Sequence, residues 1–413
     1  MENNDKRKFS PLLIIGLLFF IFGFITWLNS VLVPFLKTAC ELTNFQSYFV
    51  TFAFYIAYFV LAPFASGIIG KLGYKRSMSV GLWIMSLGAL VFLPAAAVRS
   101  YPLFLIGLFL LGGGLTLLQT AANPYAAVLG SPESAARRIS IMGVCNKTAG
   151  MLAPLLLSSF TIKKAEQIQL QIAKTGDQPF LHVPLLDELA RQCIVPYVFI
   201  VVSLFLLAVW IHYSALPEIA EEKAVVSERF SLRRYPALCG GMAAIFFYVG
   251  AEVISIDTLI NYAFSLGYGS DQARWFPVLS MLMLLAGYFI GIWGVPKHFS
   301  QRQALSVSCA AGILLSGAAL WTPGAVSLFL LAALGLANAM IWPSVWGLAV
   351  QGLGQHLHIG SSLLIMAIVG GAVLPLGYGF AADRIGLQAA YSILPVCYGI
   401  IGLYAWRNGE VRR

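Results

Sequence analysis

The chain is 413 residues long, and 59% of its residues are hydrophobic while only 10% are charged. This excludes an ordinary soluble domain, because such domains carry about 25% charged residues. The net charge is +9, with 26 Lys and Arg against 17 Asp and Glu. Since the basic residues form short clusters between long apolar runs, nucleic acid is not a predicted partner. The six cysteines are scattered singly and indicate neither a disulfide framework nor a metal site.

Twelve segments are long and apolar enough to cross a lipid bilayer, which takes about 20 residues of helix. The first is too long for a cleaved signal peptide and has no small-residue cleavage site, so we expect it to remain as a membrane helix. The fold predicted is an all-α, multi-pass integral membrane protein. The expected spans are 11–36, 45–69, 78–98, 102–129, 139–161, 194–215, 237–265, 274–295, 303–321, 325–350, 358–382 and 388–406.

The Lys and Arg residues between these spans predict the orientation, because short cytoplasmic loops carry an excess of them. With a cytoplasmic amino terminus, 17 of the 26 basic residues fall inside and 8 fall outside, four of those 8 in a long outer loop over 162–193. The remaining one, Lys147, lies within a span. We therefore expect both termini on the cytoplasmic side.

A polar, charged stretch at 217–236 divides the twelve spans six and six. A weak internal repeat supports this division, because NPYAAVLG and AGMLAP in the first half resemble WPSVWGLAV and GGAVLP in the second. Gly150 and Gly371 each precede a proline of the repeat by four residues. Two related halves with a substrate site between them are typical of transporters. The predicted units are a bundle over 1–216, a cytoplasmic linker over 217–236 and a bundle over 237–413.

Three ionisable residues lie deep within predicted spans, namely Lys147, Glu252 and Asp257. A charge at the bilayer centre costs about 2.5 kcal/mol or more, so each is a candidate for function. Lys147 needs a partner, and either acid can supply it. Glu252 and Asp257 are about 140° apart around a helix, so a regular helix does not point both at one site. The alternatives are a purely architectural ion pair and a charge pair that a coupling cation breaks.

Asp257 has Thr258 next to it and Asn261 four residues on. This pattern predicts hard oxygen ligands for an alkali cation, and a Na+ site at Asp257 is one expectation. A carboxylate can equally carry a proton.

Neutral hydrogen-bonding residues also lie deep in the first, fourth and fifth spans. Amides both donate and accept hydrogen bonds, which suits a polyhydroxylated ligand, and aromatic rings can stack on a sugar. The alternative for each amide is a helix–helix hydrogen bond, and for each ring it is packing. The predicted substrate-binding residues are Asn29, Gln119, Asn123, Asn146, Trp27, Trp342 and Trp346.

The stretches FGFITWLNSVLVPFLK (22–37), LLQTAANPYAAVLG (117–130), RISIMGVCNKTAGMLAP (138–154) and FYVGAEVISIDTLINY (247–262), with the 338–380 region, resemble the fucose and glucose/galactose permeases of the major facilitator superfamily. The resemblance covers about 15–405. It implies two pseudo-symmetric six-helix bundles, alternating access and cation-coupled uptake of a hexose across the bacterial cytoplasmic membrane.

The chain departs from that family at several positions. Where the fucose permeases carry an Asn-Asp pair on the first helix and a Glu on the fourth, this chain has Asn29-Ser30 and Gln119. Gln119 and Glu252 resemble the glucose/galactose branch. Asn146 matches an Asn associated with sugar binding, while Lys147 stands where the family has a small residue. The acidic position of the loop signature after the second helix is Gly70, so the usual cytoplasmic gate contact is not expected.

We therefore predict a secondary active transporter for a neutral hexose of the glucose/galactose type. The coupling residues expected are Asp257, Glu252, Lys147, Asn261 and Thr258. Because the first-helix proton site of the fucose permeases is absent and Asp257 has neutral oxygen neighbours, sodium is favoured over a proton as the coupling ion. The predicted partners are the sugar, the cation and the lipid bilayer, with no cofactor, and we expect a monomer.

Several alternatives stay open. They are a proton-coupled symporter for fucose or an N-acetylhexosamine, and an uncoupled facilitator or exporter. A non-transporting sensor would need a partner-binding extension, for which the linker and tails leave little room. A membrane-embedded enzyme is not predicted, because no convergent catalytic residues can be named.

Overall fold

The computed structural model describes residues 11–128, 135–160, 167–168, 171, 179–214, 216, 231–294, 298, 300–350, 353 and 357–407. Within these ranges the regular structure is helical, without strands. Eleven helical stretches of the described chain are long and apolar enough to cross a membrane. The remaining expected span, 139–161, coincides with a helix whose apolar part is shorter, Ile141–Leu157. The twelve predicted spans therefore all correspond to helices.

The amino-terminal half holds the first six spans. The first is formed by two helices in sequence, the second includes a single helical turn at its start, and the sixth is preceded by an additional helix. In chain order these elements are α1 (Pro11–Trp27), α2 (Asn29–Ala39), α3 (Asn44–Ser47), α4 (Phe49–Leu72), α5 (Tyr74–Ala97), α6 (Tyr101–Val128), α7 (Ala135–Phe160), α9 (Pro179–Arg191) and α10 (Ile194–Tyr213).

The carboxy-terminal half holds the other six, and several of these are also interrupted. The elements are η2 (Leu232–Arg234), α11 (Pro236–Asp257), α12 (Leu259–Ser265), α13 (Ser270–Ala273), α14 (Trp275–Gly294), α15 (Gln301–Trp321), α16 (Gly324–Asn338), α17 (Ile341–Ala349), α18 (Leu357–Met366), η4 (Ala367–Val369), α19 (Gly370–Ile385), α20 (Leu387–Ala390) and α21 (Ile393–Arg407). Most of the predicted linker, 217–230, lies outside the described residues.

The interruptions of the helices have local causes. Thr258, which separates α11 from α12, donates its hydroxyl to the carbonyl of Ile254, a bond that bends helices. Pro343 lacks the N–H that would bond the carbonyl of residue 339, and α16 gives way to α17 at this point. The sequence pattern predicts each of these spans as one continuous helix, so it does not predict the two breaks.

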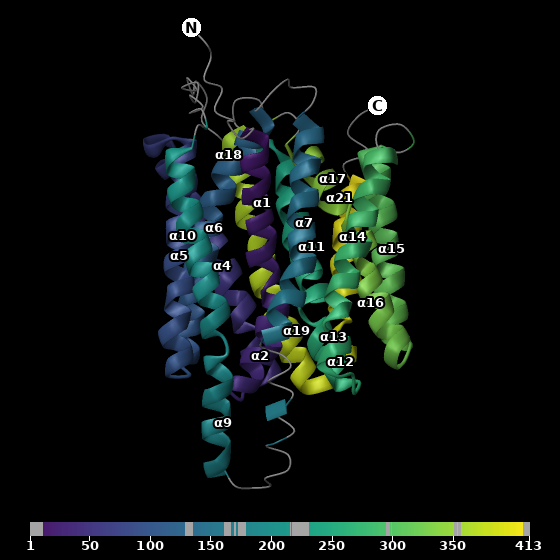
Figure 1. Ribbon diagram of the computed structural model, residues 1–413. Coiled ribbons are helices and arrows are strands. Elements are labelled where there is room, and N and C mark those ends of the chain that lie inside the picture. The colour runs from purple at the N-terminus through teal and green to yellow at the C-terminus, as the bar shows by residue number, and fades with distance from the viewer. Residues whose placement is uncertain are drawn as a thin grey trace.

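The outer loop predicted over 162–193 is not all loop, because α9 occupies its last part. Three apolar side chains of α9, Leu186, Leu189 and Ala190, are buried against the bundle. The carboxylate of Asp187 pairs with Arg99 at the end of α5, with 3.0 Å between Oδ1 and Nε. The beginning of α9 extends beyond the bundle (Figure 1).

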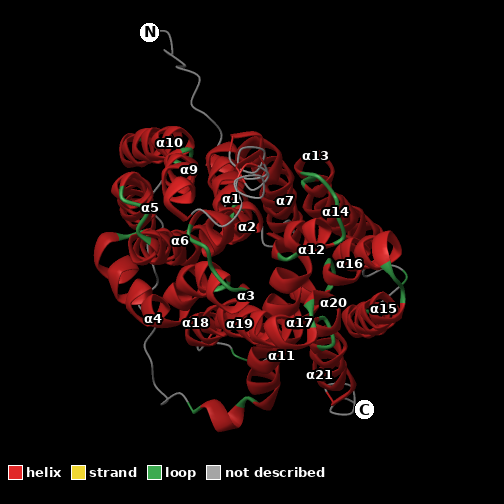
Figure 2. Cartoon of the chain, turned by 90° about the horizontal axis from the view of Figure 1, so that it is seen from below, coloured by secondary structure: helices red, strands yellow, loops and turns green. Residues whose placement is uncertain are grey.

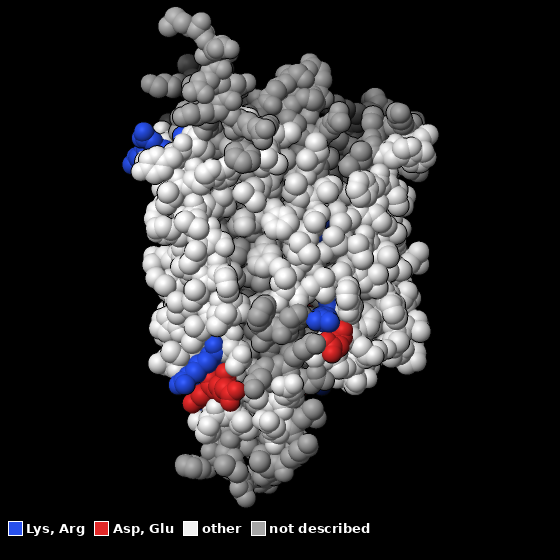
Figure 3. Space-filling view, in the orientation of Figure 1, with Lys and Arg blue, Asp and Glu red and all other residues white. Residues whose placement is uncertain are grey.

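The helices run roughly parallel, and the two halves lie side by side when the chain is viewed along them (Figure 2). The start of α1 and the end of α21 lie at the same end of the bundle (Figure 1). We call this the inner end and the opposite one, where α9 extends, the outer end. Most charged side chains on the face seen in Figure 3 lie towards the two ends, and the broad band between them is almost entirely uncharged. Such a band is the surface that a bilayer requires.

Candidate functional site

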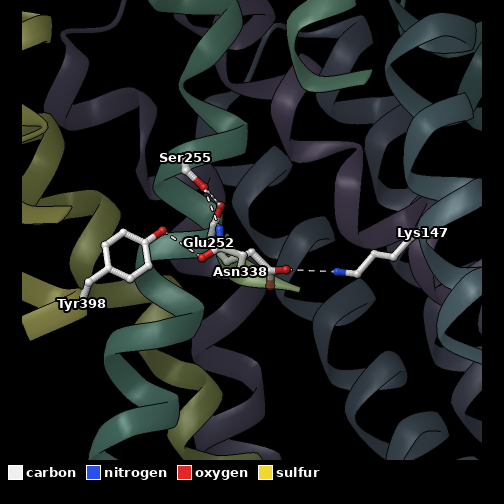
Figure 4. Close-up of polar contacts among 5 residues, drawn as sticks. All are labelled: Lys147, Glu252, Ser255, Asn338 and Tyr398. Atoms are coloured by element: carbon white, nitrogen blue, oxygen red, sulfur yellow. Dashed lines mark hydrogen bonds and ion pairs between the residues drawn. The ribbon is translucent and has the colours of Figure 1, made fainter. Parts of the chain in front are cut away.

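An ion pair joins the two halves in the middle of the bundle. Lys147 on α7 and Glu252 on α11 are 3.1 Å apart, measured from Nζ to Oε1 (Figure 4). Both residues are buried, with 8% and 7% of their surfaces exposed. Lys147 therefore pairs with Glu252, which decides between the two partners that the sequence allowed. The pair neutralises both charges where each alone would be costly.

Behind Glu252, a chain of hydrogen bonds runs into the carboxy-terminal half (Figure 4). The Ser255 hydroxyl donates to the Glu252 carbonyl at 2.9 Å. The Asn338 amide donates to Ser255 at 3.3 Å and accepts from the Tyr398 hydroxyl at 2.8 Å. These bonds link α11, α16 and α21, so they fix the turn of helix that carries Glu252.

Trp27, the last residue of α1, lies beside Lys147. The ammonium of Lys147 is 4.7 Å from the centre of the Trp27 ring, within the range of a cation–π contact. Gly150, one turn after Lys147 on α7, leaves the space for this ring, because a Cβ there would lie 2.5 Å from Trp27 Cδ1. The indole nitrogen of Trp27 is buried and has no hydrogen-bond partner within the described ranges of the chain. Trp27 thus combines a ring near the ion pair with a donor available to a ligand.

Asp257 contrasts with this paired arrangement. It is the last residue of α11, only 1% of it is exposed, and neither of its carboxylate oxygens has a hydrogen-bond partner among the described residues. Asn29 is in the same situation at the break between α1 and α2, with 1% exposure and no partner for either amide atom in the described part of the chain. Trp27 and Ile256, neighbours of the two breaks, belong to one buried cluster. Buried polar groups without partners are rare, and they mark sites that a ligand or ion can complete.

Thr258 and Asn261, the ligands predicted for a cation at Asp257, make hydrogen bonds to other residues. The Thr258 hydroxyl bonds the Ile254 carbonyl and the hydroxyl of Tyr391. Asn261 contacts Lys37 and Asn44 of the other half at the outer end. The expected spacing assumes one regular helix, and the break at Thr258 changes the direction of the residues that follow it.

The predicted amides of the amino-terminal half have different surroundings. Gln119 donates to the hydroxyl of Tyr58 at 3.1 Å. Asn146 donates to the carbonyl of Phe19 at 3.3 Å, a bond that joins α7 to α1. The side chain of Asn123 lies outside the described part of the chain. Among the predicted amides whose side chains are described, Asn29 is the one that lacks a hydrogen-bond partner.

Two aromatic groups flank the centre. Trp342 and Trp346 on α17 stack with their rings 5.5 Å apart, and Trp342 lies 6.2 Å from Tyr248, one turn before Glu252. On the opposite half, Tyr55 and Tyr58 of α4 stack at 6.0 Å. Aromatic rings therefore lie in both halves close to the paired charges.

The sequence pattern does not single out Tyr55, Tyr58, Asn338 and Tyr398. A usable signal exists for Asn338, because it is a lone amide within an apolar run, the same signal that identified Asn29. The tyrosines carry no such signal, since the phenol ring is as common in packing as in binding.

Comparison with known proteins decides the family. The sequence pattern of the Major Facilitator Superfamily matches residues 15–374. The chain belongs to the Major Facilitator Superfamily. A glucose/galactose transporter of Brucella abortus biovar 1 (strain 9-941) is 32% identical over 409 residues, which cover 98% of this chain and 95% of the relative. The L-fucose-proton symporter of Escherichia coli (strain K12) is 29% identical over 406 residues, which cover 96% and 92%.

Solved structures of this superfamily share the fold. FucP, a Major Facilitator Superfamily transporter in the outward conformation, matches with a TM-score of 0.74 at 28% identity, covering 97% of this chain and 99% of that one. A D-xylose-proton symporter at 16% identity matches with a TM-score of 0.68 and shows the fold alone. The protein is therefore a multi-pass membrane protein of a transporter family and not an enzyme.

Proposed function

We propose that the protein is a secondary active transporter that takes up a neutral hexose together with a cation across the bacterial cytoplasmic membrane. Both termini are cytoplasmic in this proposal, and the bundles over 1–216 and 237–413 move relative to each other about the linker 217–236. One copy of the chain contains both halves, so a monomer is sufficient. Names of relatives such as glucose/galactose transporter and L-fucose-proton symporter support the substrate class.

The observation that carries this proposal is the unpartnered carboxylate of Asp257. Lys147 and Glu252 neutralise each other, so ionised Asp257 adds one negative charge that no hydrogen bond stabilises. A buried charge without compensation is costly. Binding of one monovalent cation or one proton removes this cost. If sugar and cation each stabilise the same loaded state, the binding of one favours the binding of the other, which is the thermodynamic basis of coupling.

The sugar in this proposal binds between the halves. Asn29 and the indole nitrogen of Trp27 have unused hydrogen-bonding capacity there. The rings of Trp342 and Trp346 offer stacking surfaces from the other half. Gln119, Asn123 and Asn146 complete the set of amides that we propose for the sugar hydroxyls.

Two coupling ions are candidates. Sodium is the first, on the grounds that the proton-carrying acid of the fucose permeases is absent at Ser30. A proton is the second, and one structural observation favours it: the polar groups of Thr258 and Asn261 are already hydrogen-bonded to Tyr391 and Asn44. A sodium ion needs several oxygen ligands, whereas a proton needs only the carboxylate.

The test is uptake of radiolabelled glucose into proteoliposomes under an imposed sodium or proton gradient. The variant Asp257→Asn preserves size and removes the charge. We expect it to lose gradient-driven accumulation and to retain exchange of internal for external sugar. The matched control is Asp271→Asn, since Asp271 is an exposed acid at the outer end that pairs with Arg274.

Each gradient identifies its own ion. Accumulation driven by sodium at constant pH selects sodium, and accumulation driven by pH without sodium selects the proton. Equal transport by the parent chain and Asp257→Asn, independent of both gradients, would contradict coupling at Asp257 and support the uncoupled facilitator. Fucose and N-acetylglucosamine as competitors define which hexose is preferred.

A further inference from the structure

A second group of polar contacts joins the two halves at the outer end, and its nearest member, Asn261, lies four residues after Asp257. Asp383, near the end of α19, accepts two hydrogen bonds from the backbone N–H groups of Asn44 and Phe45, at 3.0 and 2.8 Å. It also accepts one from the Asn44 side chain at 2.6 Å. A carboxylate of the carboxy-terminal half therefore binds the first turn of α3 in the other half.

Asn44 is the centre of this group. Its side-chain oxygen accepts from Lys37 of α2 at 2.7 Å and from Asn261 of α12 at 3.2 Å. Lys37 also donates to the oxygen of Asn261 at 3.4 Å. Asn44 is thus hydrogen-bonded to both α12 and α19 of the opposite half. We call Lys37, Asn44, Asn261 and Asp383 the outer latch.

Close packing accompanies the outer latch. The rings of Tyr48 and Tyr378 meet edge to face at 5.6 Å, and those of Phe45 and Phe380 at 6.1 Å. A Cβ at Gly379 would lie 2.4 Å from the Tyr48 ring, so only glycine fits at this contact. The described parts of the two halves are therefore in direct contact at these rings.

The turn that presents Asp383 occurs a second time in the chain. Asp383 is followed after two residues by Gly386, with φ 88° and ψ 158°, where α19 gives way to α20. Gly70 is followed after two residues by Gly73, with φ 78° and ψ 170°, where α4 gives way to α5. Gly73 and Gly386 both lie in the left-handed region, so the two turns have the same shape. The turn between α4 and α5 lies at the inner end, and Gly70 occupies the position that corresponds to Asp383. The carboxylate is present at the outer turn and absent from the inner one.

We propose that the outer latch is the outer gate of the transport cycle and biases the empty protein towards the state closed to the outside. Opening to the outside requires Asp383 to leave the N–H groups of α3, and Asn261 to leave Asn44. Because Gly70 offers no equivalent carboxylate at the inner turn, that turn makes no matching acid contact to favour the opposite state. Asp383 acts as a positioning residue, since it touches neither the proposed sugar site nor the proposed cation site. This inference rests on the proposed transport function.

The experiment measures the distance across the outer end in the absence of sugar. Spin labels at Val183→Cys on α9 and Gln272→Cys on α13 report on the two halves, in a background without the six native cysteines. Both positions are exposed. For the parent protein in nanodiscs, double electron–electron resonance should give mainly the short, closed distance.

The variant Asp383→Ala should raise the population of molecules with the longer label-to-label distance about tenfold, and this change of the equilibrium corresponds to about 1.4 kcal/mol. Asn261→Ala should shift this population in the same direction, and Asp271→Asn should leave it unchanged. If Asp383→Ala does not fold, Asn261→Ala and Asp383→Asn provide the same readout. An unchanged distance distribution in the folded latch variants would overturn the gate.

This measurement needs neither sugar nor coupling ion, so it separates the gate from the function. A parent protein that carries no hexose, but opens in Asp383→Ala, would contradict the proposed function and keep the gate. Gradient-driven uptake in the parent protein, with no change of distance in the latch variants, would support the proposed function and contradict the gate.

Discussion

Glu252 and Asp257 lie five residues apart on α11, both are buried, and their surroundings are opposite. Glu252 pairs with Lys147, and hydrogen bonds through Ser255, Asn338 and Tyr398 fix the turn that carries it. Asp257 has no hydrogen-bond partner for either oxygen among the residues that the structure describes. One helix can therefore carry an acid whose charge a buried lysine compensates and an acid without such compensation in the described chain.

The largest effect is expected from removing the partner of Lys147. Glu252→Gln leaves the ammonium buried without a counter-charge, and breaking a buried pair in this way costs about 3–5 kcal/mol. The unfolding temperature of the purified protein should fall clearly. The double variant Lys147→Met with Glu252→Gln should recover part of the loss. A single variant as stable as the parent would mean that the pair does not compensate the charges.

A smaller effect is expected from the contact of Trp27 with the pair. Gly150→Ala places a methyl group where the Trp27 ring lies, and overpacking of this kind costs about 1–3 kcal/mol. Displacement of the ring should also raise the KM for sugar. Gly317→Ala, at a position with open space around it, is the matched control. Equal sugar affinity in the two variants would argue against Trp27 at the binding site.

Asp257→Asn should behave in the opposite way to Glu252→Gln. It removes a charge that nothing compensates, so stability should stay the same or rise by about 1 kcal/mol. Thermal unfolding without sodium, compared at one pH, measures this. Added sodium should stabilise the parent protein and not the variant if sodium is the ion. A marked loss of stability in Asp257→Asn would show that the carboxylate has a structural partner.

A small effect is also expected at the far end of the hydrogen-bond chain. Tyr398→Phe removes the donor to Asn338, and one such bond contributes about 0.5–1.5 kcal/mol. The variant should lose this stability while its coupling to the cation gradient stays intact. Loss of coupling in Tyr398→Phe would mean that the network behind Glu252 also serves the ion, and would remove the contrast between the two acids.

Much of this arrangement follows from the sequence. Apolar length located the twelve helices, and the cost of burial singled out Lys147, Glu252 and Asp257 without any structure. The choice of Glu252 as the partner of Lys147 could not be made, because it depends on how α7 and α11 are rotated against each other. Sequence spacing within one helix carries no information about that rotation.

The cation ligands expected around Asp257 illustrate the other limit. The prediction used the period of a continuous helix, and Thr258 ends that continuity by bonding back to Ile254. Asn261 then takes part in the outer latch, a role that no spacing rule suggests. Helix breaks without glycine or proline at the break itself depend on side-chain contacts, which only the folded chain contains.

The helix α9 has a practical consequence for imaging this protein. Most of a 44.8 kDa chain of this fold is hidden in a detergent micelle or nanodisc, which leaves little to align in electron cryomicroscopy. α9 has 13 residues, about 20 Å of helix, and its last turns are held by buried leucines and by the Arg99–Asp187 pair. Its beginning, near the exposed Val183, projects from the outer end. A nanobody raised against this segment would add a rigid landmark to the amino-terminal half without touching the central site.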